Sequence, residues 1–137
     1  MEQIIRQGYG VNRWKNGSVY EGMWRNNQTH GNGTFWHDTG DIYIGEFFMD
    51  KANGFGVYIH ENGSKYEGEW KEDMQHGQGE EVWNDGSKYT GNYRHGLKHG
   101  WGMYRWADGS EFKGDWVNNM ITGIGVYVWP DNKRYEG

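Results

Sequence analysis

The sequence predicts an all-β protein, an elongated and twisted single-layer antiparallel sheet built from about six β-hairpin repeats of 23 residues. Composition is the first observation behind this prediction: 24 of 137 residues are glycine and 18% are aromatic, whereas leucine occurs once and alanine twice. Good helix formers are therefore scarce, while residues that favour strands and tight turns are abundant. The second observation is a strict 23-residue periodicity without insertions, which is typical of a repeat array.

Three glycine-containing columns define the repeat. A turn residue, which is glycine at positions such as Gly63 and Gly86, lies three residues before each Tyr/Phe-x-Gly triplet. A second turn column contains Asp50, Asp73 and Gly96. These residue types tolerate left-handed backbone, which tight hairpin turns require. The Gly-x-Gly triplets begin at Gly8, Gly31, Gly54, Gly77, Gly100 and Gly123, and the Tyr/Phe-x-Gly triplets begin at Tyr20, Tyr43, Tyr66, Tyr89, Phe112 and Tyr135.

Each repeat contains two strands and two turns, as residues 65–87 illustrate. The alternating segment 65–70 predicts the first strand, and a turn around Asp73 follows it. The segment 77–83 predicts the second strand, and the Asn-Asp-Gly-Ser sequence at 84–87 predicts the next hairpin turn. We expect residues 1–7 to be a short lead-in and residues 8–137 to be the six-fold array. Because Gly137 ends inside a first strand and leaves an open sheet edge, we expect either further repeats after it or a partner that covers this edge.

The sequence contains few of the features that mark other protein classes. Its 14 basic and 19 acidic residues give a net charge of -5, which argues against a nucleic-acid partner. Cysteine is absent, and no apolar run is long enough to span a membrane. His30, His76 and His99 are separated by 46 and 23 residues, which are multiples of the repeat length, so they lie too far apart to share one metal ion. We find no catalytic constellation and expect no enzyme activity, metal or cofactor.

One family shares this arrangement of motifs. The pattern Tyr66-Glu67-Gly68-Glu69-Trp70, followed by His76-Gly77-Gln78-Gly79 and Asn84-Asp85-Gly86, resembles the MORN repeat (membrane occupation and recognition nexus). The resemblance covers residues 8–137, with Phe47 and Tyr93 in two of the tryptophan positions. It implies a scaffold. In this family such arrays occur in cytoskeletal and ciliary proteins, in proteins that bridge membranes, and beside lipid-kinase or methyltransferase domains.

Strand alternation places most aromatic residues on one face of the sheet. Glycines between the ring columns leave room for the rings to lie across the strands, so most of these rings are expected to hold the fold together. No second layer covers them, and some ring edges should therefore line an open groove that binds protein. The residues of this predicted groove are Trp24, Tyr58, Trp70, Trp83, Tyr104, Trp106, Trp116, Tyr127 and Trp129.

The opposite face, called the outer face here, is polar except in two places. A contiguous apolar surface on such a face usually marks an interface, although valine and isoleucine are also simply good strand formers. The first predicted patch consists of Trp36, Ile42, Ile44, Phe55, Val57 and Ile59, and the second of Trp101, Met103, Ile124, Val126 and Val128.

Three functions remain as hypotheses. The favoured one is a non-enzymatic scaffold or adaptor that binds protein partners, or a second copy of itself, in a cytoplasmic cytoskeletal or ciliary assembly. An alternative is a membrane tether that binds phosphoinositides through basic residues near the C-terminus, Lys113, Lys133 and Arg134. The acidic segment 38–85, with twelve acids and three bases, counts against it because an anionic bilayer would repel it. A third hypothesis is the regulatory repeat region of a larger lipid-kinase-like enzyme.

Overall fold

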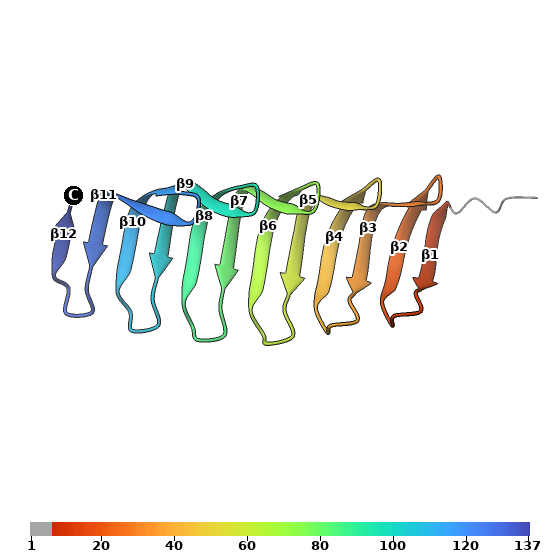
Figure 1. Ribbon diagram of the computed structural model, residues 1–137, viewed down its shortest axis with the longest axis horizontal. Coiled ribbons are helices and arrows are strands. Elements are labelled where there is room, and N and C mark those ends of the chain that lie inside the picture. The colour runs from red at the N-terminus through yellow and green to blue at the C-terminus, as the bar shows by residue number, and fades with distance from the viewer. Residues whose placement is uncertain (1–6) are drawn as a thin grey trace, which may run out of the picture.

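The computed structural model describes residues 7–137, so the predicted lead-in lies, apart from Gln7, outside the described residues. The described chain forms twelve strands in one antiparallel sheet, whose spatial order follows the sequence and whose first and last strands lie at opposite ends (Figure 1). This confirms the predicted fold class. The strands are β1 (Gly8–Arg13), β2 (Val19–Arg25), β3 (Gln28–Trp36), β4 (Ile42–Phe48), β5 (Lys51–Ile59), β6 (Lys65–Lys71), β7 (Met74–Val82), β8 (Lys88–Arg94), β9 (Leu97–Arg105), β10 (Glu111–Val117), β11 (Met120–Val128) and β12 (Arg134–Glu136).

The turn after each Tyr/Phe strand is tighter than the sequence suggested. Between β6 and β7 it consists of Glu72 (φ 48°) and Asp73 (φ 68°), both with left-handed backbone. Two consecutive positive φ angles are typical of the type I′ hairpin turn, whose twist matches that of the flanking strands. Strand β7 consequently begins at Met74, three residues before the predicted start at Gly77.

The other turn of each repeat is closed by a short polar side chain. After β5, the Asn62 Oδ1 atom accepts the Ser64 N–H at 2.8 Å, and the His60 N–H donates to the Ser64 carbonyl at 2.8 Å. Gly63 occupies the left-handed position of this turn (φ 93°). The recurring Asn/Asp-Gly-Ser motif is therefore a turn motif in the structure, as the sequence predicted.

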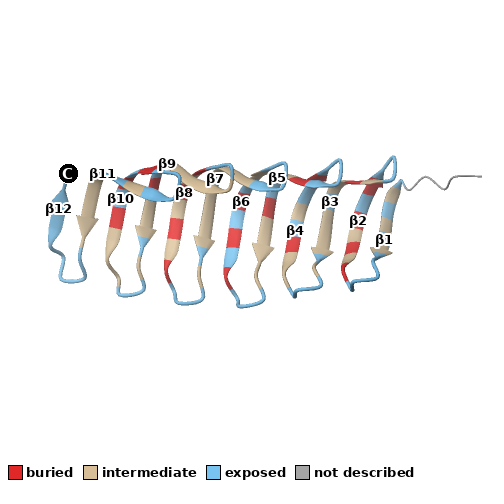
Figure 2. Ribbon diagram, viewed as in Figure 1, coloured by how far each residue is buried: buried red, intermediate tan, exposed pale blue. Residues whose placement is uncertain are grey.

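The core is a row of aromatic rings that pack against glycine residues of the sheet. Tyr20, Tyr66, Tyr89 and Phe112 are fully buried, and Figure 2 shows buried bands that recur on β2, β4, β6, β8 and β10. Gly22 and Gly33 face each other across β2 and β3, and the Tyr20 ring lies over them, so a Cβ atom at Gly33 would overlap with the ring. Glycine in these columns thus makes the space that the tyrosine rings fill.

Consecutive tight turns are joined to each other by hydrogen bonds. The Asp73 N–H donates to the Ala52 carbonyl at 2.9 Å, and the Ala52 N–H donates to Asp73 Oδ1 at 2.7 Å. The same reciprocal pair joins Asp50 with Thr29. These bonds link each repeat to the next, in addition to the backbone ladder between the strands.

Candidate functional site

The structure divides the predicted groove residues into two rows. Trp24 and Trp116 are buried and belong to the packed core, and Trp70 lies partly buried beside them. Their rings meet the core tyrosines edge to face, with Tyr66 and Trp70 centroids 5.1 Å apart at 84°. The second row remains accessible to solvent; it consists of half-buried Tyr58, Trp83, Tyr104, Trp106 and Tyr127 and exposed Trp129.

The accessible rings nearest the C-terminus form a continuous ladder, called the ring ladder here. Successive centroids are 5.5 Å apart from Trp83 to Tyr104, 4.8 Å from Tyr104 to Trp106, 6.1 Å from Trp106 to Tyr127 and 5.9 Å from Tyr127 to Trp129. The last two pairs are stacked, with interplanar angles of 16° and 25°. The ring ladder therefore offers broad π-faces across β9 and β11 and the turns beside them.

A pocket of about 290 Å³ opens on the ring face near the middle of the ribbon. Ala52 and the rings of His37, Tyr58 and Trp70 are among its lining residues, and so are two carboxylates, Asp50 and Asp73; we call it the Ala52 pocket. The sequence analysis named Tyr58 and Trp70 but missed Ala52. Strand alternation alone would have placed Ala52 on the ring face, opposite Phe47.

Polar contacts fix one wall of this pocket. The Tyr58 hydroxyl donates to Asp41 Oδ2 at 2.7 Å, and the Glu61 N–H donates to Asp41 Oδ1 at 2.9 Å. These bonds, the tyrosine's first, hold the pKa of the Asp41 carboxyl below its ordinary value. Burial, reinforced by Asp41, raises the pKa of the Tyr58 phenol well above its ordinary value, so the hydroxyl remains a donor.

Lys98 is the second residue on the ring face that the sequence analysis missed. Its side chain is half-buried among aromatic rings, and burial lowers the pKa of its ammonium below the ordinary value, an effect that the charge of Glu81 opposes. In sequence it looks like one basic residue of a basic segment. The structure instead places it between the packed core and the ring ladder.

The first outer-face patch is contiguous in the structure. Trp36, Ile42 and Ile59 are direct neighbours on β3, β4 and β5, and Ile44 lies beside Val57 in the next row. Phe55 extends the patch along β5 and has 53% of its surface exposed. All six predicted residues therefore lie on three adjacent strands.

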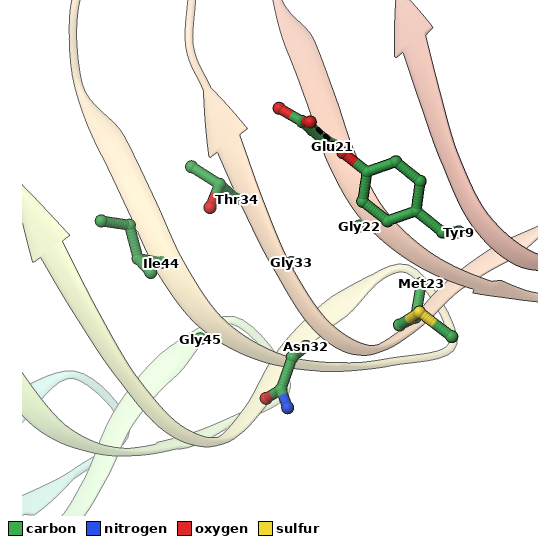
Figure 3. A pocket seen from close by; sticks show the side chains of 9 residues that line it. All are labelled: Tyr9, Glu21, Gly22, Met23, Asn32, Gly33, Thr34, Ile44 and Gly45. Carbon is green, nitrogen blue, oxygen red and sulfur yellow. Dashed lines mark hydrogen bonds between the residues drawn. The ribbon is translucent and has the colours of Figure 1, made fainter.

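A shallow hollow of about 590 Å³ adjoins this patch (Figure 3). Ile44 lines one side and Met23 and Asn32 line the other, while the facing glycines of β2, β3 and β4 form part of the lining. Tyr9 lies at the end of the hollow, where its hydroxyl donates to the Glu21 carboxylate. Because Ile44 belongs to both, the hollow and the first patch form one continuous surface.

The second predicted patch is divided by a charged strand. Met103 is paired with Lys113 of β10, and Lys113 is paired with Val126 of β11. Asp115 likewise lies next to Trp101, which is 59% exposed. The structure therefore separates Trp101 and Met103 from the valine and isoleucine residues of β11.

The basic residues proposed for lipid contact are interleaved with acids. Lys133 pairs with Asp131 at 3.8 Å, and Arg134 pairs with Glu136 at 3.2 Å. Lys113 lies on β10, and strand β11 separates it from this group. The three cations do not form a surface of one sign.

Within residues 7–137, no three His, Cys, Asp or Glu side chains come close enough together to hold a metal ion. The same part of the chain contains no helix of the length and apolarity that crossing a bilayer requires.

Comparison with solved structures finds matches at low sequence identity. The TCP domain of Drosophila melanogaster SAS-4 (dCPAP), in complex with a proline-rich motif of Ana2 (dSTIL), is 12% identical, with a TM-score of 0.40 over 94% of this chain and 83% of that chain. The G-box domain of the microcephaly protein CPAP is 13% identical, with a TM-score of 0.42 over 93% of this chain and 73% of that chain. Among curated proteins, none matches this sequence.

The hairpins, the glycine-backed rings and the single open sheet define an elongated β-repeat array. A family model identifies the repeat: the MORN repeat matches at residues 3–19, 20–42, 43–65, 66–88, 89–111 and 112–134. The chain therefore belongs to the MORN repeat family. The first matched segment begins within the predicted lead-in, and later segments begin at the Tyr/Phe column.

Proposed function

We propose that this chain is a non-enzymatic scaffold whose ring face binds a polypeptide partner. The observation that carries this proposal is the ring ladder. The buried rings of the core already fill the space above the glycines, whereas the rings from Trp83 to Trp129 form an accessible second row. Accessible aromatic side chains that are held rigid by their neighbours are characteristic of protein interfaces.

The partner is expected to lie across the strands of the ring face. Its apolar, aromatic or cationic side chains would contact the π-faces of Trp106 and Tyr127, whose stacked rings offer a flat surface. The first outer-face patch supplies a second interface, for another partner or a second copy, because six apolar side chains lie together there without a covering layer. The MORN family resemblance favours a cytoskeletal or ciliary assembly as the setting.

Selection from a random peptide library tests the proposal. Peptides that bind the immobilised chain would be titrated against the wild type and the Trp106→Ser and Trp101→Ser variants. Trp106 belongs to the ring ladder and Trp101 is exposed on the outer face, so the two substitutions are matched in chemistry but not in location. We expect Trp106→Ser to weaken binding about tenfold and Trp101→Ser to leave it unchanged. Equal affinity for Trp106→Ser and the wild type would overturn the proposal.

Flotation with vesicles tests the lipid alternative. The chain would be mixed with phosphatidylcholine vesicles with and without a phosphoinositide, at low and moderate salt. We expect no flotation, because Asp131 and Glu136 are paired with the basic side chains of this end. Salt-sensitive flotation that is lost on substituting Lys133 and Arg134 would favour the membrane tether instead.

A further inference from the structure

The ring face already holds one cation of its own. The Lys98 Nζ atom lies 4.9 Å from the centroid of Trp83, 5.5 Å from Tyr89, 5.9 Å from Tyr104 and 6.0 Å from Trp116. These distances are within the range of about 6 Å over which a cation is attracted to an aromatic face. This fold can therefore place an ammonium group among four rings of its ring face.

The same cage of four ring positions recurs elsewhere in the array, but without the lysine. Two repeats earlier, the column of Lys98 contains Ala52, and the four ring columns contain His37, Tyr43, Tyr58 and Trp70. All five of these residues line the Ala52 pocket. The methyl group of Ala52 occupies far less space than a lysine side chain, and a volume of about 290 Å³ remains open to solvent.

The two cages differ in charge. The Ala52 pocket is also lined by Asp50 and Asp73, whereas the equivalent residues beside Lys98 are Gly96 and Asn119. Each aspartate accepts a backbone N–H through Oδ1 at 2.7 Å, and these bonds do not use Oδ2. The surrounding segment 38–85 contains twelve acids and three bases. A cationic occupant therefore meets complementary charge as well as aromatic faces.

We propose that the Ala52 pocket binds the ammonium group of a lysine side chain from a partner polypeptide. The apolar stem of that lysine would lie against the pocket rings, and its ammonium would reach the carboxylates of Asp50 and Asp73. The proposal rests on the scaffold function, since the partner must lie on the ring face. It adds that a basic residue anchors this partner at the acidic middle of the ribbon.

Methyl NMR tests the pocket directly. The chain contains two alanines, Ala52 and Ala107, so a sample with labelled alanine methyl groups gives one signal from the pocket and one internal control. The probe is N-acetyl-lysine N-methylamide, and the matched control probe is N-acetyl-norleucine N-methylamide, which lacks the ammonium. We expect the lysine probe to shift the Ala52 methyl and Trp70 indole signals saturably and to leave the Ala107 methyl signal unchanged. Its affinity should be at least about tenfold higher than that of the norleucine probe.

Two variants separate charge from structure. Ala52→Lys supplies an internal ammonium, as Lys98 does in its own cage, and should abolish binding of the probe. Asp73→Asn removes one charge and should weaken binding several-fold while it preserves the backbone contact, because Asn119 Oδ1 accepts the Lys98 N–H at 2.8 Å in the equivalent pair. Undiminished binding to Ala52→Lys would overturn the proposal, as would equal affinity for the lysine and norleucine probes.

The outcomes also distinguish this proposal from the scaffold function. If library peptides bind the ring ladder but the lysine probe leaves the Ala52 methyl signal unmoved, the lysine pocket is wrong and the scaffold stands. If the lysine probe binds but no library peptide depends on Trp106, both the scaffold and a partner lysine are overturned, and the pocket binds small amines only.

Discussion

The Trp70 indole Nε1–H donates a hydrogen bond to the backbone carbonyl of Gly56 at 3.1 Å, reaching fourteen residues back along the chain. Trp24 makes the same bond to Gly10, and Trp116 makes it to Gly102. Each of these indole N–H groups thus has a backbone carbonyl acceptor on the preceding strand. This explains why a large ring with a donor recurs at a position that shape alone could fill with phenylalanine.

The Trp70→Phe variant tests the value of this bond. Phenylalanine is compatible with the position, because Phe47 occupies the same column in another repeat. Loss of the donor leaves the Gly56 carbonyl without its indole partner, and we expect the free energy of unfolding to fall by about 1 kcal/mol, plus a smaller loss of apolar contact. Urea denaturation measures this loss in the free energy of unfolding. Trp101→Phe, on the exposed outer face, is the control, and an equal loss in that variant would contradict the explanation.

Gly79→Ala tests the close approach of ring and backbone. A Cβ atom at Gly79 would lie 2.6 Å from Cε2 of the buried Tyr66 ring, so the ring or the strand must move. We expect a loss of about 1–3 kcal/mol in the free energy of unfolding, as is usual for an overpacked core. The neighbouring exposed residue gives the control: Gln78→Ala should change stability by less than about 0.5 kcal/mol. Indistinguishable unfolding curves for the two variants would refute the packing argument.

Much of this architecture follows from period and alternation. The 23-residue repeat and the two-residue alternation of a strand are backbone properties, so they correctly placed Tyr20 and Tyr66 in the core and Ile42 beside Ile59 on the outer face. Such predictions need no knowledge of side-chain conformation. They depend on which face a residue occupies and on which repeat contains it.

Features that depend on exact register or side-chain conformation escaped prediction. Met49 and Glu72 adopt left-handed backbone (φ 49° and 48°) although neither residue type favours it, because the tight turn imposes that conformation. Lys98 looks solvated in sequence, but its stem can fold over the rings. The second predicted patch is not continuous, because Lys113 of the intervening strand lies between Met103 and Val126.

Tyr58→Phe is expected to raise the pKa of Asp41. The Tyr58 hydroxyl is the first cause of the lowered pKa, and the Glu61 N–H, which remains in the variant, is the second. The carboxyl titration of Asp41, followed by NMR, should therefore move up toward the ordinary value of about 3.9 without reaching it. An unchanged titration midpoint would show that the hydroxyl does not hold the carboxylate.

The same shift has a consequence for stability. A carboxyl whose pKa is depressed in the folded state stabilises the fold above its unfolded pKa, and this contribution is lost as the pH falls through the folded pKa. Wild type should therefore be more stable than Tyr58→Phe near neutral pH, and the difference should narrow as the solution becomes more acidic. Denaturation of both proteins at neutral pH and near pH 3 measures this difference in the free energy of unfolding. A difference that widens in acid would contradict this linkage.

Gly96→Asn should stabilise the protein. Gly96 belongs to the turn column in which Asp73 and Asn119 accept a backbone N–H from the preceding turn region, and glycine has no side chain to offer Gln75. The backbone at Gly96 (φ 79°) is close to that of Asn119 (φ 71°), and the nearest atom to a Cβ there, Gln75 Oε1, is 3.8 Å away. The new hydrogen bond and the stiffer unfolded chain should together add about 1 kcal/mol to the free energy of unfolding.

Gly96→Ala is the matched control, because it adds a Cβ atom without an acceptor and strains the left-handed backbone, so it should lower stability. A Gly96→Asn variant no more stable than wild type in urea would show that the side-chain bond between turns contributes nothing to the array.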